Sequence, residues 1–308
     1  MKRLHVVPEI NEANGVYQVA RDLARESGGE VIDARQFQST NLNNRTIEQF
    51  SEVWVHGMWL PREWRACWLA LRLGKRLVRM THGSLSPIYL EKQGKWKKRL
   101  VGPIERWLLR RSDRIVVTCE AEKGWIKAYV GNGCPEIVVE DLKRFFNIVR
   151  LFDCSDCSIE KKRNLHLLYL GRRHPLKGVN YLEQVVKELN QSFEQSNNPN
   201  NRTIDLRIVS DHFGEELERD WDWCDALCLP TLSENFGRVV AEALERGKRV
   251  VTTDGAPAWG EGALFDCSDC SDCSIGYGGR LVYLKGYRDG TDEERVRLLK
   301  GALEGFLT

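Results

Sequence analysis

The stretch PTLSENFGRVVAEALERGKRVVTT, residues 230–253, joins the end of one strand to the start of another through a loop and a helix. The apolar run ALCLP predicts a strand that ends at Pro230, and RVVTT predicts the next strand at 249–253. The spacing of apolar residues between them predicts a helix over 235–246. A strand–loop–helix–strand unit of this kind is typical of a parallel sheet covered by helices.

The helix start in this stretch is suited to a phosphorylated ligand. The first N–H groups of a helix have no partner within it, and together with the positive end of the dipole they favour a diphosphate. Glu242 follows Glu234 by 242 − 234 = 8 residues, about two helical turns, and its carboxylate could accept hydrogen bonds from ribose hydroxyls. By themselves, Glu242 and Glu245 are equally compatible with a solvated helix surface.

A second informative stretch is LLYLGRRHPLKGVNYLEQVV at 167–186, which predicts a strand running into Gly171 and a helix over 178–190. Arg172 and Lys177 fall in the loop between them. A forked guanidinium and an ammonium on one loop are suited to neutralising phosphate charge. An ordinary solvated basic turn carries the same two residues, so this stretch alone leaves both interpretations open.

Strands and helices alternate along the rest of the chain. The expected strands are 4–7, 53–57, 76–83, 114–119, 136–139, 165–171, 204–209, 226–230 and 249–253. A final helix is expected from Thr291, with Glu294 completing a capping box. The Asn-rich stretch 191–203 predicts an exposed loop. The simplest α/β architecture is a pair of doubly wound domains joined near 145–163, with ligands bound at the carboxyl ends of the strands, in the cleft between the domains.

The composition of the whole chain fits a two-domain globular protein. Its 308 residues are 42% hydrophobic and 29% charged. A formal net charge of only +2 gives no reason to expect nucleic-acid binding. Since the N-terminus lacks a signal-peptide core and no stretch approaches about 18 apolar residues, we expect a cytoplasmic protein with free thiols.

Together, GRxxxxKG at 171–178 and SENFGxxxxEAL at 233–244 resemble the donor site of glycosyltransferase family 4, the group 1 glycosyl transferases. In that family the two glutamates are separated by seven residues. NGVYQVARDLA at 14–24 resembles the family's glycine-containing first loop and helix. HGMWLPREWRACWLALRLGKRLVRMTHGSLSP at 56–87 resembles the segment between its HGLW-like strand and its HG-containing loop. The resemblance covers most of the chain.

The resemblance implies the GT-B fold, with two Rossmann-like domains facing across a cleft. It divides the chain into an acceptor domain at 1–146, a nucleotide-sugar donor domain at 164–290 and a C-terminal helix at 291–308. Family members usually have one more strand–helix unit between the GRxxxxKG helix and the strand before SENFG. Here the Asn-rich stretch 191–203 stands in its place, so we expect a shortened donor domain.

The resemblance also implies roles for individual residues. Arg172 and Lys177 would hold the donor diphosphate and stabilise it as the leaving group, and Glu242 would bind the ribose. Glu234 would face the donor sugar, and the backbone of 235–237 (Asn235, Phe236 and Gly237) would contact sugar and phosphate. Gly15 would permit close approach in the first loop. His82 would lie near the reacting sugar.

The family retains the anomeric configuration and requires no metal, which agrees with the absence of a convincing Asp-x-Asp metal pair beside a donor site. We therefore expect no cofactor and a same-face displacement, because no residue is placed as a covalent nucleophile. The expected activity is that of a hexosyltransferase acting on a glycan or lipid-linked acceptor in surface polysaccharide or glycolipid synthesis. The alternative is a catalytically degenerate donor-binding protein.

Two cysteine repeats stand apart from the family pattern. LFDCSDCSI occurs at 151–159 and LFDCSDCSDCSI at 264–275, so Cys154, Cys157, Cys267, Cys270 and Cys273 have C-x-x-C spacing. This spacing can indicate zinc or an iron–sulfur cluster, and hence a metal-binding interaction protein. Since the flanking residues recur too and the spacers are Ser-Asp, we favour a short repeat expanded into two loops, with no metal site.

The stretch 92–114, KQGKWKKRLVGPIERWLLRRSDR, interleaves cationic and aromatic residues. Such a stretch can lie on an anionic membrane surface or meet a lipid diphosphate acceptor, and it can equally be a plain amphipathic surface helix. The sequence therefore leaves open whether the protein has peripheral contact with the inner face of a membrane.

Overall fold

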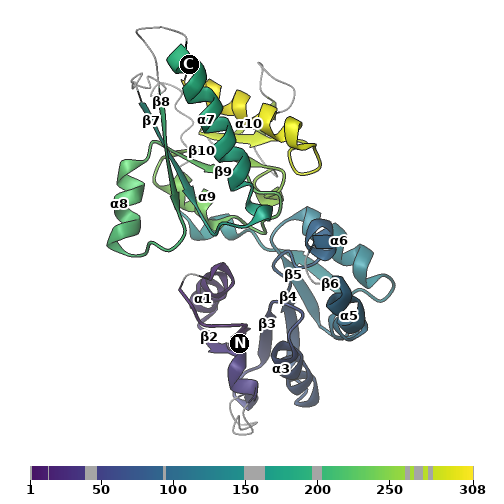
Figure 1. Ribbon diagram of the computed structural model, residues 1–308. Helices are drawn as coiled ribbons and strands as arrows, with labels where there is room; N and C mark the ends of the chain where they lie inside the picture. Colours follow the sequence, from purple (N-terminus) through teal and green to yellow (C-terminus); the bar gives the residue numbers. More distant parts are fainter. Residues whose placement is uncertain are drawn as a thin grey trace. The chain divides into compact units, whose positions relative to one another are not determined.

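The computed structural model describes residues 2–12, 14–38, 47–92, 95–148, 164–195, 203–260, 264–266, 273–276 and 280–307, without the side chains of 92, 95, 264–266 and 273–276. The chain divides into two compact units, Met1–Phe145 and Phe146–Thr308 (Figure 1). Each unit has one sheet with helices packed on it, as expected for two Rossmann-like domains. No helix of the described residues is long and apolar enough to cross a membrane.

The N-terminal unit contains a six-stranded sheet in the order β2-β1-β3-β4-β5-β6, with every neighbouring pair parallel. Its strands are β1 (Arg3–Val7), β2 (Glu30–Asp33), β3 (Glu52–His56), β4 (Arg76–Met80), β5 (Arg114–Val117) and β6 (Glu136–Val139). Its helices are α1 (Gly15–Ser27), η1 (Ala34–Gln38), α3 (Pro61–Arg72), α4 (Pro87–Lys92), α5 (Lys95–Arg110), α6 (Glu120–Val130) and η2 (Leu142–Phe145).

Alternation along the strands sets the two faces of this sheet. Leu4 and Val6 of β1 and Val53 and Val55 of β3 are fully buried and pack with Ala66 of α3 in one core cluster. The residues between them point to the opposite face, because successive side chains of a strand alternate. On β1 and β3 the α3 side of the sheet is therefore apolar, while the other face carries His5, Trp54 and His56.

The C-terminal unit contains a seven-stranded sheet in the order β11-β12-β13-β10-β9-β7-β8. Its strands are β7 (Asn164–Leu170), β8 (Thr203–Val209), β9 (Ala226–Leu229), β10 (Arg249–Thr253), β11 (Leu264–Asp266), β12 (Cys273–Gly276) and β13 (Leu281–Leu284). Its helices are η4 (Pro175–Lys177), α7 (Val179–Gln195), α8 (Glu215–Trp223), α9 (Arg238–Glu245), η5 (Pro257–Trp259) and α10 (Asp292–Leu307). Figure 1 shows α10 beside α7, against which it packs.

Between α7 and β9 the described residues contain one strand–helix unit, β8 and α8. The sheet reaches seven strands because β11 and β12 pair antiparallel with each other and β12 pairs antiparallel with β13 at the opposite edge. The expectation that both cysteine repeats are loops was therefore wrong for 264–266 and 273–276. The first repeat lies outside the described residues.

Local chemistry decides where the helices begin and end. The predicted capping box is confirmed, because Thr291 N donates to Glu294 Oε2 at 2.6 Å and Glu294 N donates to Thr291 Oγ1 at 3.2 Å. The predicted helix at 235–246 is shorter than expected, because Gly237 is left-handed (φ 67°) and serves as the N-cap of α9. The predicted loop at 191–203 was wrong for 191–195, which continue α7.

In each sheet the first strand of the unit lies between the second and the third, in the order β2-β1-β3 and β8-β7-β9. The crossover connections leave such a strand pair in opposite directions, which opens a crevice at the carboxyl ends of the two strands. We call the pair β1 and β3 the N-terminal switch point and the pair β7 and β9 the C-terminal switch point. The predicted site residues lie at or next to these two places.

Candidate functional site

Backbone hydrogen bonds join the loops that follow β7, β9 and β10. The carbonyl oxygen of Leu176 accepts from Leu232 N at 2.8 Å and from Thr231 Oγ1 at 3.1 Å. Glu234 lies in the loop after β9, and its backbone N–H donates to the carbonyl of Gly255, in the loop after β10, at 2.8 Å. Three loops from three adjacent strands therefore form one connected surface at the C-terminal switch point.

A glycine allows the first two loops to approach each other closely. Gly178 has φ 66°, and a Cβ built there would lie 2.0 Å from the carbonyl oxygen of Pro230. No real side chain tolerates that distance, and a left-handed backbone already disfavours L-residues. The glycine that ends GRxxxxKG is thus required by the contact between the loops.

Lys177 and Glu234 meet across this contact. The Nζ atom of Lys177 forms an ion pair with Oε2 of Glu234, and both side chains are half-buried. The two residues are 57 positions apart in the chain and belong to the loops after β7 and β9. The structure therefore brings together the two residues that the sequence assigned to the diphosphate and to the donor sugar.

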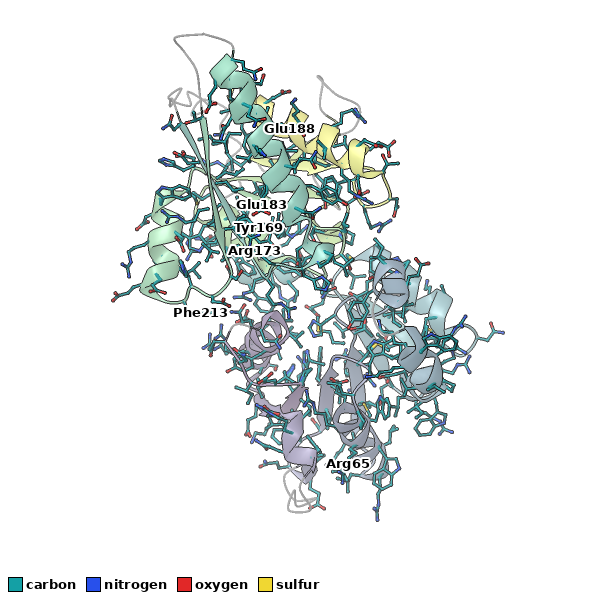
Figure 2. The ribbon with its side chains drawn as sticks, in the orientation of Figure 1. Arg65, Tyr169, Arg173, Glu183, Glu188 and Phe213 are labelled. Carbon is teal, nitrogen blue, oxygen red and sulfur yellow. The ribbon has the colours of Figure 1, made fainter. Side chains whose placement is uncertain are left out.

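Arg172 and Arg173 lie side by side in the loop after β7 but have different surroundings. Arg173 donates from Nη2 to Glu183 Oε1 at 2.9 Å, and Figure 2 shows the two residues with Tyr169 on the same part of the unit. The side chain of Arg172 is exposed, and among the described residues it has no ion-pair partner. Its backbone is fixed, because its carbonyl oxygen accepts from the Tyr169 hydroxyl at 3.0 Å. Arg172 is therefore the guanidinium of this loop that is free for a ligand.

The three residues after Glu234 turn the chain into α9. Asn235 N donates to Glu234 Oε1 at 3.3 Å. Phe236 is buried, and its carbonyl oxygen accepts from Trp259 Nε1 at 2.5 Å. Gly237 provides no side chain to cap α9, so the positive end of this helix is not neutralised by its own N-cap.

Glu242 lies on the second turn of α9. Its Oε1 atom accepts from Arg238 Nε at 3.1 Å, one turn earlier, and its side chain is half-buried. Burial raises the pKa of the Glu242 carboxyl, while Arg238 opposes that rise. By contrast, Glu245 is exposed and accepts from Asn147 N at 2.9 Å. The helix therefore separates a half-buried carboxylate from an ordinary surface one.

The two remaining predicted residues belong to the N-terminal unit. Gly15 is the first residue of α1, and Asn14 Oδ1 caps that helix by accepting from Val16 N at 2.9 Å. A Cβ at Gly15 would meet none of the described atoms within 4 Å, so packing gives no reason for a glycine there. His82 follows β4 and has φ 49°, which is unusual for a residue other than glycine.

Two residues that the sequence did not single out hold His82. The carboxylate of buried Glu122 in α6 accepts from Thr81 Oγ1 and from Gly83 N, both at 2.6 Å, so it binds the residues on either side of His82. The imidazole of His82 is held by His56 at the end of β3, with 2.9 Å between His82 Nε2 and His56 Nδ1. His56 begins the HGMW motif but had no assigned role, and Glu122 has no sequence signal, because both contacts depend on which elements are neighbours in the fold.

No group of three or more His, Cys, Asp or Glu residues suited to a metal ion occurs among the residues that the structure describes. Of the repeat cysteines, Cys154, Cys157, Cys267 and Cys270 lie outside those residues, as does the side chain of Cys273. The other five cysteines are free thiols, and all but Cys134 are buried.

Comparison with known proteins finds one matching family model and one distant relative. Residues 15–139 match the family model of the Glycosyl transferase 4-like domain. An uncharacterized 41.2 kDa protein in the cps region of Klebsiella pneumoniae is 21% identical over 262 residues, which cover 81% of this chain and 73% of that protein.

Solved structures share the fold at low sequence identity. The Anabaena protein HepE, in complex with UDP, superposes with a TM-score of 0.59 at 15% identity, over 99% of this chain and 90% of that one. HepE in complex with UDP-glucose gives the same values. A trehalose-phosphate synthase from Burkholderia vietnamiensis superposes with a TM-score of 0.57 at 9% identity, over 98% and 92% of the two chains. The chain thus matches the Glycosyl transferase 4-like domain over 15–139, and its two units have the GT-B fold of the solved structures.

Proposed function

We propose that this glycosyltransferase transfers a sugar, with retention of configuration, from a nucleotide diphosphate donor to a glycan or lipid-linked acceptor. The proposal places the donor diphosphate at the C-terminal switch point and requires neither a metal nor another cofactor. The proposed setting is surface polysaccharide or glycolipid synthesis, at the cytoplasmic face of a membrane. The relative in a cps region supports this setting.

The ion pair between Lys177 and Glu234 carries the proposal. A half-buried ammonium needs a counter-charge, and in this structure Glu234 supplies it. A diphosphate bound at the same loops would offer Lys177 a second anionic partner, next to exposed Arg172 and the positive end of α9. HepE, which shares the fold, has been solved with UDP and with UDP-glucose, which supports a nucleotide sugar as the donor.

The same groups account for the chemistry. As the bond between the anomeric carbon and the leaving oxygen breaks, negative charge grows on the β-phosphate. Lys177, Arg172 and the N-terminus of α9 would stabilise that charge, and fixed positive groups of this kind are usually the largest contribution to such a reaction. Glu234 already has a cationic partner, which favours a role in holding the sugar or Lys177 over attack on the anomeric carbon.

Nucleotide binding by variants of the full chain tests the donor site. Lys177→Ala and Glu242→Ala are each expected to weaken binding of UDP by about 1–3 kcal/mol, as for hydrogen bonds that involve a charged group. Titration calorimetry with UDP, or with another nucleoside diphosphate selected by a thermal-shift screen, measures the effect.

Two matched controls lie beside the tested residues. Arg173→Ala removes a cation of the same loop that is paired with Glu183, and Glu245→Ala removes the exposed carboxylate of α9. Both should bind nucleotide like the parent. If Lys177→Ala and Glu242→Ala also bind like the parent, the assignment of the donor site is wrong. Binding without any sugar transfer would instead indicate a degenerate donor-binding protein.

The helix α5 supports a membrane-bound acceptor. Its side chains Trp96, Leu100, Ile104 and Trp107 follow one another at intervals of one helical turn, and they are 78%, 81%, 43% and 46% exposed. Large apolar side chains aligned on one exposed stripe are uncommon on a protein that meets only water. We infer that this stripe docks on a lipid surface.

Charge beside the stripe selects an anionic surface. Lys97, Arg99 and Arg111 are exposed, and the guanidinium groups of Arg99 and Arg111 lie 5.9 Å and 5.5 Å from the ring centres of Trp96 and Trp107. Lys98 differs from them, because its ammonium donates to the Tyr89 carbonyl at 2.6 Å and burial lowers its pKa to about 8. Lys98 thus belongs to the fold, and the other three are available to lipid headgroups.

Co-sedimentation with vesicles tests this surface. Vesicles that contain phosphatidylserine should bind the protein, whereas purely zwitterionic vesicles should not, and salt should weaken the binding because the Debye length falls from about 10 Å at 0.1 M to about 3 Å at 1 M. Trp96→Ser with Leu100→Ser, and separately Lys97→Gln with Arg99→Gln, should reduce it. Equal binding to both kinds of vesicle, or none to either, would contradict the proposal. Lys187→Gln, on the C-terminal unit, serves as the control.

A further inference from the structure

Three histidines form a hydrogen-bonded chain across three neighbouring strands of the N-terminal sheet. His5 lies on β1, His56 ends β3 and His82 follows β4. His5 Nδ1 lies 3.0 Å from His56 Nε2, and His56 Nδ1 lies 2.9 Å from His82 Nε2. The ring centres are 5.2 Å apart in both pairs, close to the usual separation of neighbouring strands. The chain therefore links the N-terminal switch point to His82.

All three rings are neutral around pH 7. Burial lowers the pKa of His5 and of His82 to about 3, and it lowers the pKa of His56 well below the ordinary value. A neutral imidazole carries one N–H and one lone pair. Each hydrogen bond in the chain needs one donor and one acceptor, so the position of the proton on one ring sets its position on the other two. The chain consequently has two arrangements, which run in opposite directions.

The inner end of the chain selects one direction. His5 Nε2 is buried, and it has no hydrogen-bond partner among the described residues. In folded proteins an orphaned buried N–H is rarer than an acceptor that lacks a donor. The lone pair of His5 therefore belongs on Nε2 and its proton on Nδ1, which donates to His56 Nε2. His56 Nδ1–H then donates to His82 Nε2, and the proton of His82 is on Nδ1.

The backbone around His82 is fixed independently of this chain. Thr81 and Gly83 are both bound to Glu122, which holds His82 at its positive φ. Such a backbone conformation costs on the order of 1–3 kcal/mol and persists only where neighbouring contacts enforce it. The hydrogen bonds of Glu122 hold the backbone of His82, and those of the neighbouring histidines hold its half-buried imidazole, at the carboxyl edge of the sheet.

We propose that His5 and His56 are positioning residues that fix the tautomer of His82, so that His82 presents Nδ1–H as a neutral hydrogen-bond donor to an oxygen atom of the bound substrate. In this arrangement His82 does not act as a general base, because its remaining nitrogen is occupied by the Nδ1–H of His56. The contact between His82 and substrate rests on the proposed function, whereas the hydrogen bonds among the three histidines do not.

The tautomers are measured directly by NMR of the full chain labelled with 15N-histidine, since the protonated and unprotonated ring nitrogens have distinct shifts. The sequence has six histidines, so His5→Leu, His56→Gln and His82→Gln variants suffice for assignment of the three. We expect His5, His56 and His82 to carry their protons on Nδ1 at pH 7 without any ligand. A His82 protonated at Nε2, or an even mixture of tautomers, would overturn the proposal.

A matched pair of variants then tests whether the signal travels through two rings. Leu and Asp have the same branched shape, but only the carboxylate of Asp accepts a hydrogen bond. His5→Asp should draw the Nε2–H of His56 towards it and so transfer the proton of His82 to Nε2. His5→Leu removes this partner of His56 without replacing it, so His82 should show a mixture of both tautomers. A contribution of His5 to packing alone would affect the two variants alike, so identical His82 tautomers in both would refute the coupling.

Activity provides the second readout. With a nucleotide sugar that binds the parent, His5→Asp should turn over about tenfold more slowly than His5→Leu, which corresponds to the loss of about one hydrogen bond in the transition state. Equal rates despite different tautomers would refute the donor role of His82. If no nucleotide sugar binds the parent, the proposed function fails, while the NMR comparison still shows whether the tautomers of the three histidines are coupled. If His5→Asp does not fold, the tautomer of the parent is decisive.

Discussion

At the C-terminal switch point, backbone hydrogen bonds between neighbouring loops and one close glycine contact fix the geometry, and the charged side chains project from that frame. At the N-terminal switch point the reverse holds. Buried polar side chains from separate elements, such as Glu122, His5 and His56, fix a loop in which the backbone of His82 is itself unfavourable. Both switch points present a polar group at the carboxyl ends of parallel strands.

The difference indicates what each site can do. Lys177 and Glu234 are half-buried and form an ion pair through flexible side chains, so a ligand with its own charge can replace one partner by a small rotation. The imidazole chain allows no such exchange, because the partners of each ring are set by the strand order. The C-terminal site is suited to binding and releasing a charged donor, and the N-terminal site to presenting one fixed hydrogen bond.

The largest effect is expected from a change in the backbone frame. Gly178→Ala combines a left-handed backbone with a Cβ 2.0 Å from the Pro230 carbonyl, so the loops must separate. We expect the free energy of unfolding of the C-terminal unit to fall by about 5 kcal/mol, or folding to fail. Thermal unfolding measures this. Gly124→Ala, on the exposed side of α6 with no described atom near its Cβ, should instead stabilise by about 0.5–1 kcal/mol.

A buried ion pair can be used to test whether buried polar side chains organise the N-terminal unit. Arg79 of β4 and Glu105 of α5 are both fully buried and lie 3.3 Å apart. Arg79→Met would leave the carboxylate of Glu105 without its cation and is expected to destabilise the N-terminal unit by about 3–5 kcal/mol. Denaturant unfolding provides the measurement. The control is Glu30→Gln, which breaks the exposed pair with Lys2 and should cost less than about 1 kcal/mol. Similar losses in both variants would show that burial of charge does not organise this unit.

The smallest expected effect is on how stability depends on pH. The pKa of His5 is about 3 in the folded chain and about 6.5 in the unfolded chain, so between these values only the unfolded chain takes up the proton. The stability that His5 contributes is therefore present above pH 6.5 and is lost as the pH falls towards 3, by about 1.4 kcal/mol per pH unit.

His5→Leu should remove that dependence, so the variant should lose stability more slowly than the parent between pH 6 and pH 4. Unfolding by urea at several pH values measures the difference. Groups that do not interact with His5 cancel in this comparison. One of them is Glu63, whose pKa is raised by burial to about 8 and whose contribution has the opposite sign. Parallel stability curves for parent and variant would mean that His5 is not neutral in the folded chain.

Local patterns in the sequence predicted most of the secondary structure. The nine expected strands are all present, because apolar runs bounded by polar or glycine residues report burial directly. The capping box at Thr291 was equally local. β2, β11, β12 and β13 were not predicted. β11 and β12 are short, and they form only where β12 pairs with β13 at a distant edge of the sheet and β11 pairs with β12.

The site shows the same division. The spacing of Lys177, Glu234 and Glu242 was visible in the sequence, because residue types at fixed intervals carry the family resemblance. The ion pair between Lys177 and Glu234 required the order β9-β7 in the sheet, and the connection from His82 to His5 required the order β1-β3-β4. The sequence by itself determined which elements form and which residues end them, because those depend on neighbours along the chain. Only the tertiary structure decided which strand ends lie side by side, because burial of the whole sheet sets strand order, and with it the partner of each buried polar group.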